Sequence, residues 1–128
     1  MAYYFSKKVK GNMQEVAGQV RGALKNYGFG VISEIDIQKT FKEKLGEDFR
    51  PYLILGACNP HFAYQALQSE DKIGTMLPCN IIIQQIDKDT VEVAAVDPAA
   101  SMSAVENKDL GNIAHNVQSR LREMVNEL

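Results

Sequence analysis

The sequence predicts an α+β fold in which helices are layered against a largely antiparallel sheet. Stripes of apolar residues at helical spacing run through 12–28 and 107–128, and each stripe is long enough to cover one face of a sheet. Residues 79–87 and 90–96 form two strands joined by the short turn Asp87-Lys88-Asp89-Thr90, which predicts a hairpin. The expected order of elements is β-α-β-α-β-α-β-β-α, with the helices packed on the sheet.

The chain is expected to begin with a strand from Tyr3 to Val9, followed by the most clearly marked helix. Asn12 can cap this helix, and Glu15 lies three residues on, where its carboxylate can reach back to the cap. Gly28 supplies the left-handed residue that ends the helix. The inner stripe of the helix contains Met13, Val16, Ala17, Val20, Leu24 and Tyr27.

Residues 29–37 are expected to form a second strand. One face of this strand would carry Phe29, Val31, Ile35 and Ile37. Asp36 can then cap a short helix over 37–45, which Gly46 ends. The continuous apolar run Tyr52-Leu53-Ile54-Leu55-Gly56-Ala57-Cys58 predicts a strand that is buried on both faces or covered by a dimer partner.

Asn59 and Pro60 are the expected cap and first residue of a third helix. The apolar positions of this helix are Phe62, Ala63, Ala66 and Leu67. Ile73-Gly74 breaks the pattern before the hairpin, and Asp97-Pro98 ends the hairpin's second strand. A loop rich in Ala and Ser leads to the last helix. The inner stripe of that helix contains Leu110, Ile113, Ala114, Val117, Leu121, Met124 and Leu128.

The composition indicates one globular domain spanning 1–128 and argues against several function classes. The chain is 45% hydrophobic and 23% charged, which are ordinary globular values. Its formal charge is −2, and no dense basic block is present, so we expect no nucleic acid and no membrane among its partners. Because no signal peptide or bilayer-length apolar stretch is evident, we expect a cytoplasmic protein with reduced thiols.

Two motifs around the two cysteines are the best candidate site: Ala57-Cys58-Asn59-Pro60 and Leu77-Pro78-Cys79-Asn80. Cys58 ends a strand just before a helix whose N-terminal amides favour a thiolate. Cys79 begins the next strand. Antiparallel neighbouring strands would place both cysteines at one end of the sheet, whereas parallel strands would separate them by roughly 20 Å. We expect the antiparallel arrangement.

Two interpretations of the cysteines remain open. Cys58, Cys79 and His61 could supply ligands for a soft metal such as Zn or Cu(I), although paired zinc-type spacing is missing. Alternatively, the cysteines are small buried hydrophobic residues, and Asn59 and Asn80 bond the neighbouring backbone. His115 on the last helix is expected to have a non-catalytic role at the surface. No phosphate loop, nucleophile elbow or acid–base pair is evident, so the sequence indicates no particular enzyme activity and leaves open whether the protein is an enzyme.

The same motifs carry a family resemblance. The residues concerned are Leu45-Gly46, Leu55-Gly56-Ala57-Cys58-Asn59-Pro60, Ala63, Ala66-Leu67, Ile73-Gly74, Leu77-Pro78-Cys79-Asn80 and Asp97-Pro98. In these residues the sequence resembles the bacterial and archaeal family called domain of unknown function three hundred and two, over nearly the whole chain. The resemblance implies a compact fold similar to the TATA-binding-protein-like class and a homodimer. It implies no activity and no cofactor, and the shared fold does not imply DNA binding.

Two functions are therefore expected as alternatives. The first is a small homodimeric protein with a thiol-centred site, in which Cys58 and Cys79 contact a soft metal, a sulfur species or a small anion. In that site Asn59 and Asn80 would orient the loops, and Pro60 would start the helix beside them. The second is a non-catalytic dimeric interaction module in which the cysteine motifs are structural.

Both alternatives predict a dimer. Its interface would use the apolar strands around Leu53-Ile54-Leu55 or Ile81-Ile82-Ile83. If either thiol is functional, Cys58 is expected to be the more reactive one, because it directly precedes a helix start.

Overall fold

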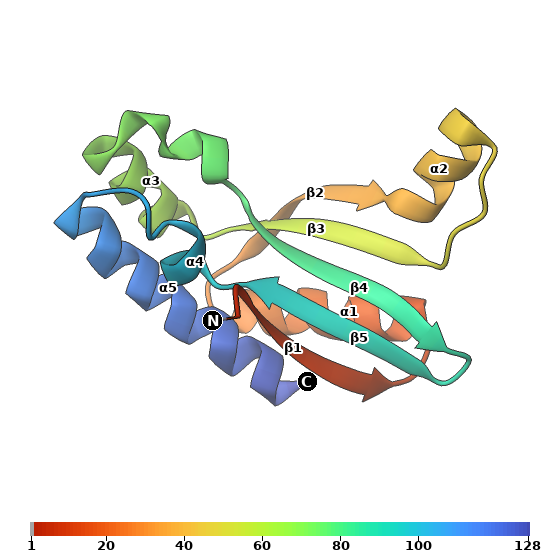
Figure 1. Ribbon diagram of the computed structural model, residues 1–128. Helices are drawn as coiled ribbons and strands as arrows, with labels where there is room; N and C mark the ends of the chain where they lie inside the picture. The colour runs from red at the N-terminus through yellow and green to blue at the C-terminus, as the bar shows by residue number, and fades with distance from the viewer. Residues whose placement is uncertain (1) are drawn as a thin grey trace.

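The computed structural model describes residues 2–128 and contains one five-stranded antiparallel sheet in the order β1-β5-β4-β3-β2 (Figure 1). The strands are β1 (Tyr4–Lys10), β2 (Gly30–Asp36), β3 (Tyr52–Cys58), β4 (Cys79–Asp87) and β5 (Thr90–Val96). The helices are α1 (Met13–Asn26), α2 (Ile37–Leu45), α3 (Pro60–Ser69), η1 (Asp71–Met76, a 3-10 helix), α4 (Pro98–Ser101) and α5 (Lys108–Glu127). The predicted α+β class and element order are confirmed, with η1 and α4 added between the expected elements.

Helix α1 and much of helix α5 cover one face of the sheet, and the main core lies between them and the strands (Figure 1). Fully buried side chains from both layers meet there, and burying each contributes about 1.5–3 kcal/mol. They include Val20, Leu24, Leu55, Ile81, Ile83, Leu121 and Met124. The helical and strand periodicities of the sequence therefore converge on a single layer of apolar contacts.

Local capping explains why α1 begins and ends where the sequence predicts. The backbone N–H of Glu15 donates to Asn12 Oδ1 at 2.9 Å, and Asn12 Nδ2 donates to Glu15 Oε1 at 2.6 Å. A cap of this kind stabilises a helix by about 1 kcal/mol. After the helix, Gly28 has a φ of +85°, a conformation that side-chain-bearing residues rarely adopt.

The face predicted for the second strand is wrong in part, because β2 contains a bulge. The pairing of β2 with β3 shifts register between Val31 and Ser33. An extra residue at that point reverses which side chains face the helices. Phe29 and Val31 therefore contact the core, whereas Ile35 pairs with Ile54 on the other face and is 47% exposed.

The face of the sheet opposite α1 and α5 is open over much of its area. Its central row crosses all five strands and contains Ser6, Ala94, Ile82, Ile54 and Ile35. The apolar run of β3 is thus buried on the helical face alone, where Leu55 is fully buried. Ile81 and Ile83 are fully buried as well, so only alternate residues of the two predicted dimer segments face outwards.

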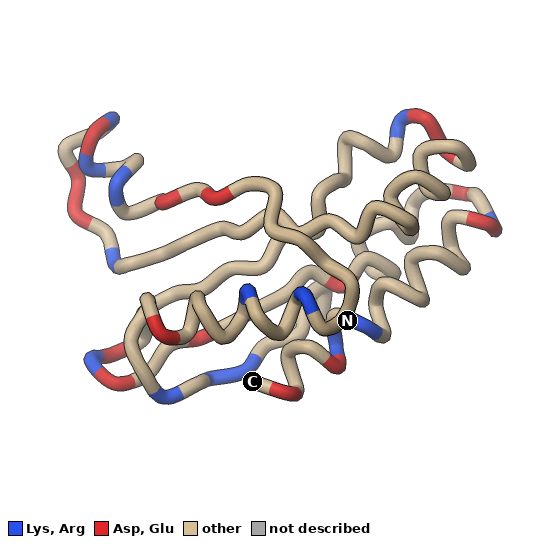
Figure 2. The backbone as a smooth tube through the Cα atoms, turned by 180° about the vertical axis from the view of Figure 1, so that it is seen from behind, with Lys and Arg blue, Asp and Glu red and all other residues tan. Residues whose placement is uncertain are grey.

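Charged residues of both signs are interspersed along the backbone, as Figure 2 shows. Helix α3 is an exception, because its ten residues include no Lys, Arg, Asp or Glu. Among residues 2–128, no helix combines the length and the hydrophobicity that crossing a bilayer requires.

Candidate functional site: an apolar cavity beside two thiols

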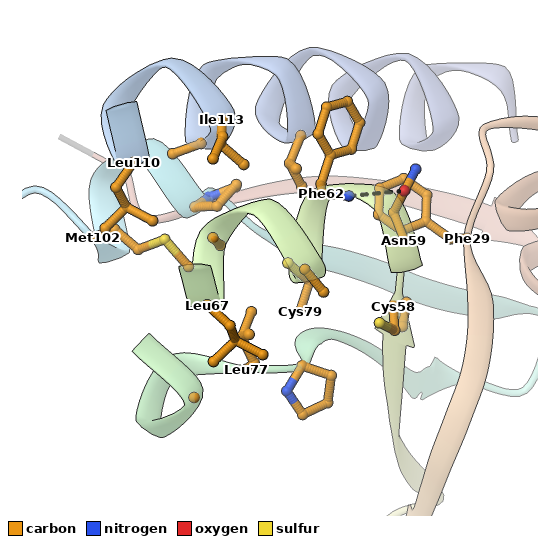
Figure 3. A pocket seen from close by; sticks show the side chains of 18 of the residues that line it. Phe29, Cys58, Asn59, Phe62, Leu67, Leu77, Cys79, Met102, Leu110 and Ile113 are labelled. Carbon is orange, nitrogen blue, oxygen red and sulfur yellow. Dashed lines mark hydrogen bonds between the residues drawn. The ribbon is translucent and has the colours of Figure 1, made fainter. Parts of the chain in front are cut away.

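A cavity of about 330 Å³ lies where β3 ends and β4 begins, bordered by α3, η1, α4 and α5 and open to solvent on one side (Figure 3). Its wall is almost entirely apolar, and no charged side chain is among the described residues that line it. Helix α3 contributes Phe62, Ala63, Ala66 and Leu67. Helix α5 contributes Leu110, Ile113, Ala114 and Val117, which recur at helical spacing and therefore share one face.

Polar contacts attach α3 to α5 at the two ends of this cavity. At the C-terminal end of α3, Ser69 Oγ donates to Asn107 Oδ1 at 3.1 Å, and Asn107 Nδ2 donates to the Ser69 carbonyl at 2.9 Å. At its N-terminal end, the Arg120 guanidinium lies 5.1 Å from the centre of the Phe62 ring. Arg120 also donates to the Tyr27 carbonyl at 3.1 Å, which connects α5 to the end of α1.

Small side chains leave the space between these two attachments. Ala63 and Ala66 on α3 and Ala114 on α5 line the cavity where larger residues would fill it. Ala66 and Ala114 are each only 4% exposed, so the space is not a result of surface position. The polar contacts at the two ends fix how α3 and α5 lie against each other, and the alanines between them leave part of the space unfilled.

The buried carboxylate of Asp97 holds α4, which forms part of the cavity wall, against α5. Asp97 is 5% exposed, and its Oδ1 accepts from the backbone N–H groups of Ala99 and Ala100 at 3.0 and 3.3 Å. Gln118 Nε2 donates to both carboxylate oxygens at 3.0 and 3.1 Å. These bonds hold α4 against α5 and place Pro98 and Met102 in the cavity wall.

Asn59 joins the start of α3 to the turn after α1. Its Oδ1 accepts from the Phe62 backbone N–H at 3.3 Å, which caps α3 as predicted. A Cβ added at Gly28 would lie 2.9 Å from Asn59 Nδ2, so the two residues are in close contact. Asn59 is 8% exposed and forms part of the cavity wall.

Both cysteines lie at the same end of the sheet and line the cavity (Figure 3). Strands β3 and β4 are antiparallel, and Ala57 is the residue opposite Cys79, so Cys58 lies one residue beyond that pair. Both thiols are free. Cys79 is 7% exposed, and burial, together with a smaller effect of the neighbouring Cys58, raises the pKa of its thiol from 9.0 to about 11. Cys58 is only partly buried.

The other predicted site residues lie away from this wall. Pro60 is exposed at the first turn of α3, and Asn80 is exposed on the open face of the sheet, in a shallow depression with Tyr4 and Tyr52. His115 is also exposed, with its Nδ1 3.4 Å from Gln118 Oε1.

The proposed metal set of Cys58, Cys79 and His61 does not come together. Within the described part of the chain, no three His, Cys, Asp or Glu side chains form a group that could hold a metal ion. The reason is local: His61 is exposed on α3, whereas Cys79 is buried in the cavity wall. The structure therefore does not bring these three residues together as metal ligands.

The two thiols are expected to differ sharply in reactivity. The Cys79→Ser protein retains only Cys58, and the Cys58→Ser protein retains only Cys79. Near neutral pH, Cys58 should react with iodoacetamide at least about tenfold faster than Cys79, because the Cys79 thiol is buried and stays protonated. The rate at which Cys79 is alkylated should rise roughly tenfold per pH unit as the pH approaches 11. Mass spectrometry of quenched samples measures both rates. Faster reaction of the protein that retains Cys79 would contradict this assignment.

The residues that form most of the cavity were predicted as apolar stripes and not as a site. Phe29 and the lining residues of α3 and α5 belong to helical or strand faces that would normally be filled core, whereas Met102 lies in the segment expected to be a loop. The alanines at 63, 66 and 114 were the available signal, because small residues on two facing stripes leave room between helices.

Fold and site together define a class: a small α+β protein with one antiparallel sheet, helices on one face, and an apolar cavity beside two cysteine motifs. The sequence profile described as Domain of unknown function DUF302 matches residues 5–128, and the chain belongs to this family. A crystal structure of an uncharacterized conserved DUF302 protein from Bacillus stearothermophilus is similar, with a TM-score of 0.90 and 27% identity over 98% of each chain. No curated protein matches the chain.

Proposed function

We propose that this protein binds a small, mainly apolar molecule in the cavity between α3 and α5, with the thiols of Cys58 and Cys79 in the wall. The observation that carries the proposal is a cavity of about 330 Å³ with an apolar wall. Small-molecule sites occupy about 300–1,000 Å³ and are lined mainly by apolar side chains with a few polar groups. Here those few groups are the two thiols and the Asn59 amide.

The lining favours one kind of ligand among those considered for a thiol-centred site. A small anion or a hydrated metal ion would lose its solvation in this wall, and no opposite charge is provided there in return. An uncharged molecule loses little solvation on entry and gains contacts with the apolar side chains. A neutral sulfur compound stays compatible with the site, since thiols and Met102 line it.

The proposal is tested by titrating the protein with N-phenyl-1-naphthylamine, a neutral apolar fluorophore whose emission rises in apolar surroundings. We expect saturable binding of one molecule per chain near neutral pH. Loss of the signal on unfolding in urea is the control for specific binding by the folded protein. A signal that rises linearly without saturation would contradict the proposal.

We also propose that the protein is a homodimer formed through the open face of the sheet. The row Ala94, Ile82, Ile54 and Ile35 is apolar and crosses four strands, and Tyr4 beside it is 43% exposed. The homodimer implied by the family resemblance needs such a self-complementary surface, and a stable interface buries roughly 1,200 Å² or more.

Sedimentation at micromolar concentration should show a dimer, and Ile82→Lys should shift it to monomer, because a lysine would be buried unpaired at the centre of the interface. Ser119→Lys, on the exposed side of α5, is the matched control and should leave the dimer intact. Circular dichroism verifies that both variants fold. A monomeric natural protein would remove the proposal.

A further inference from the structure

We infer that the ligand of this cavity is an uncharged linear aliphatic molecule of about ten heavy atoms, with its apolar end between α3 and α5 and its polar end beside Cys58, at the start of α3. The inference rests on the proposed function and narrows it to one class of ligand. Three features of the cavity carry it: its length, its volume and the direction in which its wall becomes exposed.

The cavity is long because its walls are two helical stripes. The lining residues of α5 run from Leu110 to Val117, a separation of seven residues, which corresponds to roughly 10 Å along a helix axis. The contacts Ser69–Asn107 and Phe62–Arg120 show that α3 runs antiparallel beside this stretch. An extended chain lying parallel to the two helices can therefore contact both of them over this stretch.

The volume limits how much of a chain fits. A cavity of about 330 Å³ holds on the order of ten groups, taking roughly 30 Å³ for each water-sized group. A longer chain would have to leave part of itself in water. The wall offers mainly aliphatic contacts, with aromatic rings only from Phe29 and Phe62 near the N-terminal end of α3.

The exposure of the wall sets the direction of the ligand. At the inner end, Leu110, Met102 and Ala114 are 2%, 9% and 4% exposed. At the opposite end, which forms the rim, Ile32 is 65% exposed and Cys58 is only partly buried (Figure 3). A polar group at the inner end would find no partner, so the polar end must lie at the rim, where water reaches it.

The absence of charge in the lining favours a neutral end over an ionised one. No Lys or Arg is among the described residues that line the cavity, and α3 carries no charge at all (Figure 2). A carboxylate at the rim would therefore lose part of its hydration without gaining a charged partner. A neutral alcohol of equal length should bind at least as tightly.

The test is displacement of N-phenyl-1-naphthylamine by linear alcohols from hexan-1-ol to dodecan-1-ol, with decanoate as the charged comparison. Affinity should rise about fourfold per methylene while the chain still fits, and then level off near ten heavy atoms. Decan-1-ol should compete at least as well as decanoate. It should also slow alkylation of Cys58 in the Cys79→Ser protein, which places the alcohol at that rim.

The outcomes separate the inference from the proposed function. Binding of the fluorophore with no chain-length dependence, a rise that continues through dodecan-1-ol, or tighter binding of decanoate would overturn the inference and leave the cavity as a binding site. Unchanged alkylation of Cys58 at saturating decan-1-ol would overturn the assigned direction of the chain. Failure of the fluorophore itself to bind would instead remove the proposed function.

Discussion

Replacing Gly56 by Ala is expected to lower the free energy of unfolding by about 2 kcal/mol, because the new methyl group has no space. Gly56 lies in β3, opposite Ser33 of β2 and Asn80 of β4. A Cβ at this position would collide with Ser33 Oγ and would lie 2.7 Å from Pro78 Cγ. The serine hydroxyl can rotate away, but the proline ring cannot, so the backbone before β4 has to move.

That movement should also weaken binding in the cavity, since Pro78 and Cys79 both belong to its wall. Urea denaturation followed by circular dichroism measures the stability change. Gly18→Ala is the matched control: a Cβ there meets nothing within 4 Å on the exposed side of α1, and the change should stabilise the protein by about 1 kcal/mol. A Gly56→Ala protein as stable as the natural one would show that this contact is not tight.

Filling the cavity is expected to have the opposite effect on stability and a large effect on binding. Ala114→Leu places three further carbon atoms in the space between α3 and α5, where they gain contacts that the cavity leaves unmade. Because Leu suits a helix almost as well as Ala, we expect a stability gain of about 1 kcal/mol. Binding of N-phenyl-1-naphthylamine should weaken by more than about tenfold.

Asn116→Leu is the control for this variant. It introduces the same side chain two residues further along α5, at an exposed position outside the cavity wall. Binding of N-phenyl-1-naphthylamine by the Asn116→Leu protein should be unchanged. A gain in stability combined with a loss of binding is typical of a site maintained for function, whereas a filled core would be destabilised by the extra volume.

Much of the fold could be predicted because its signals are local. The strands β3, β4 and β5 have the bounds that the apolar run and the Asp87–Thr90 turn predicted. The bulge in β2 could not be predicted, since it depends on how Ser33 pairs with Gly56 across the sheet. Helix α4 depends in the same way on a distant residue, the Gln118 amide that bonds Asp97.

The candidate site was predicted in position but not in kind. The expectation that β3 and β4 are antiparallel neighbours placed Cys58 and Cys79 at one end of the sheet, and the strand pairing confirms it. Whether the facing stripes of α3 and α5 meet or leave a cavity depends on the distance between the helices. That distance is set by contacts such as Asn107 with Ser69, which no helical periodicity reveals.

The central claim is that the space between α3 and α5 is a binding site and not a packing defect. The most direct measurement is parallel titration of the natural, Ala114→Leu and Asn116→Leu proteins with N-phenyl-1-naphthylamine. The account predicts saturable binding to the natural and Asn116→Leu proteins and binding weakened by more than about tenfold in a stabilised Ala114→Leu protein. Equal binding by all three proteins, or none by any of them, would contradict it.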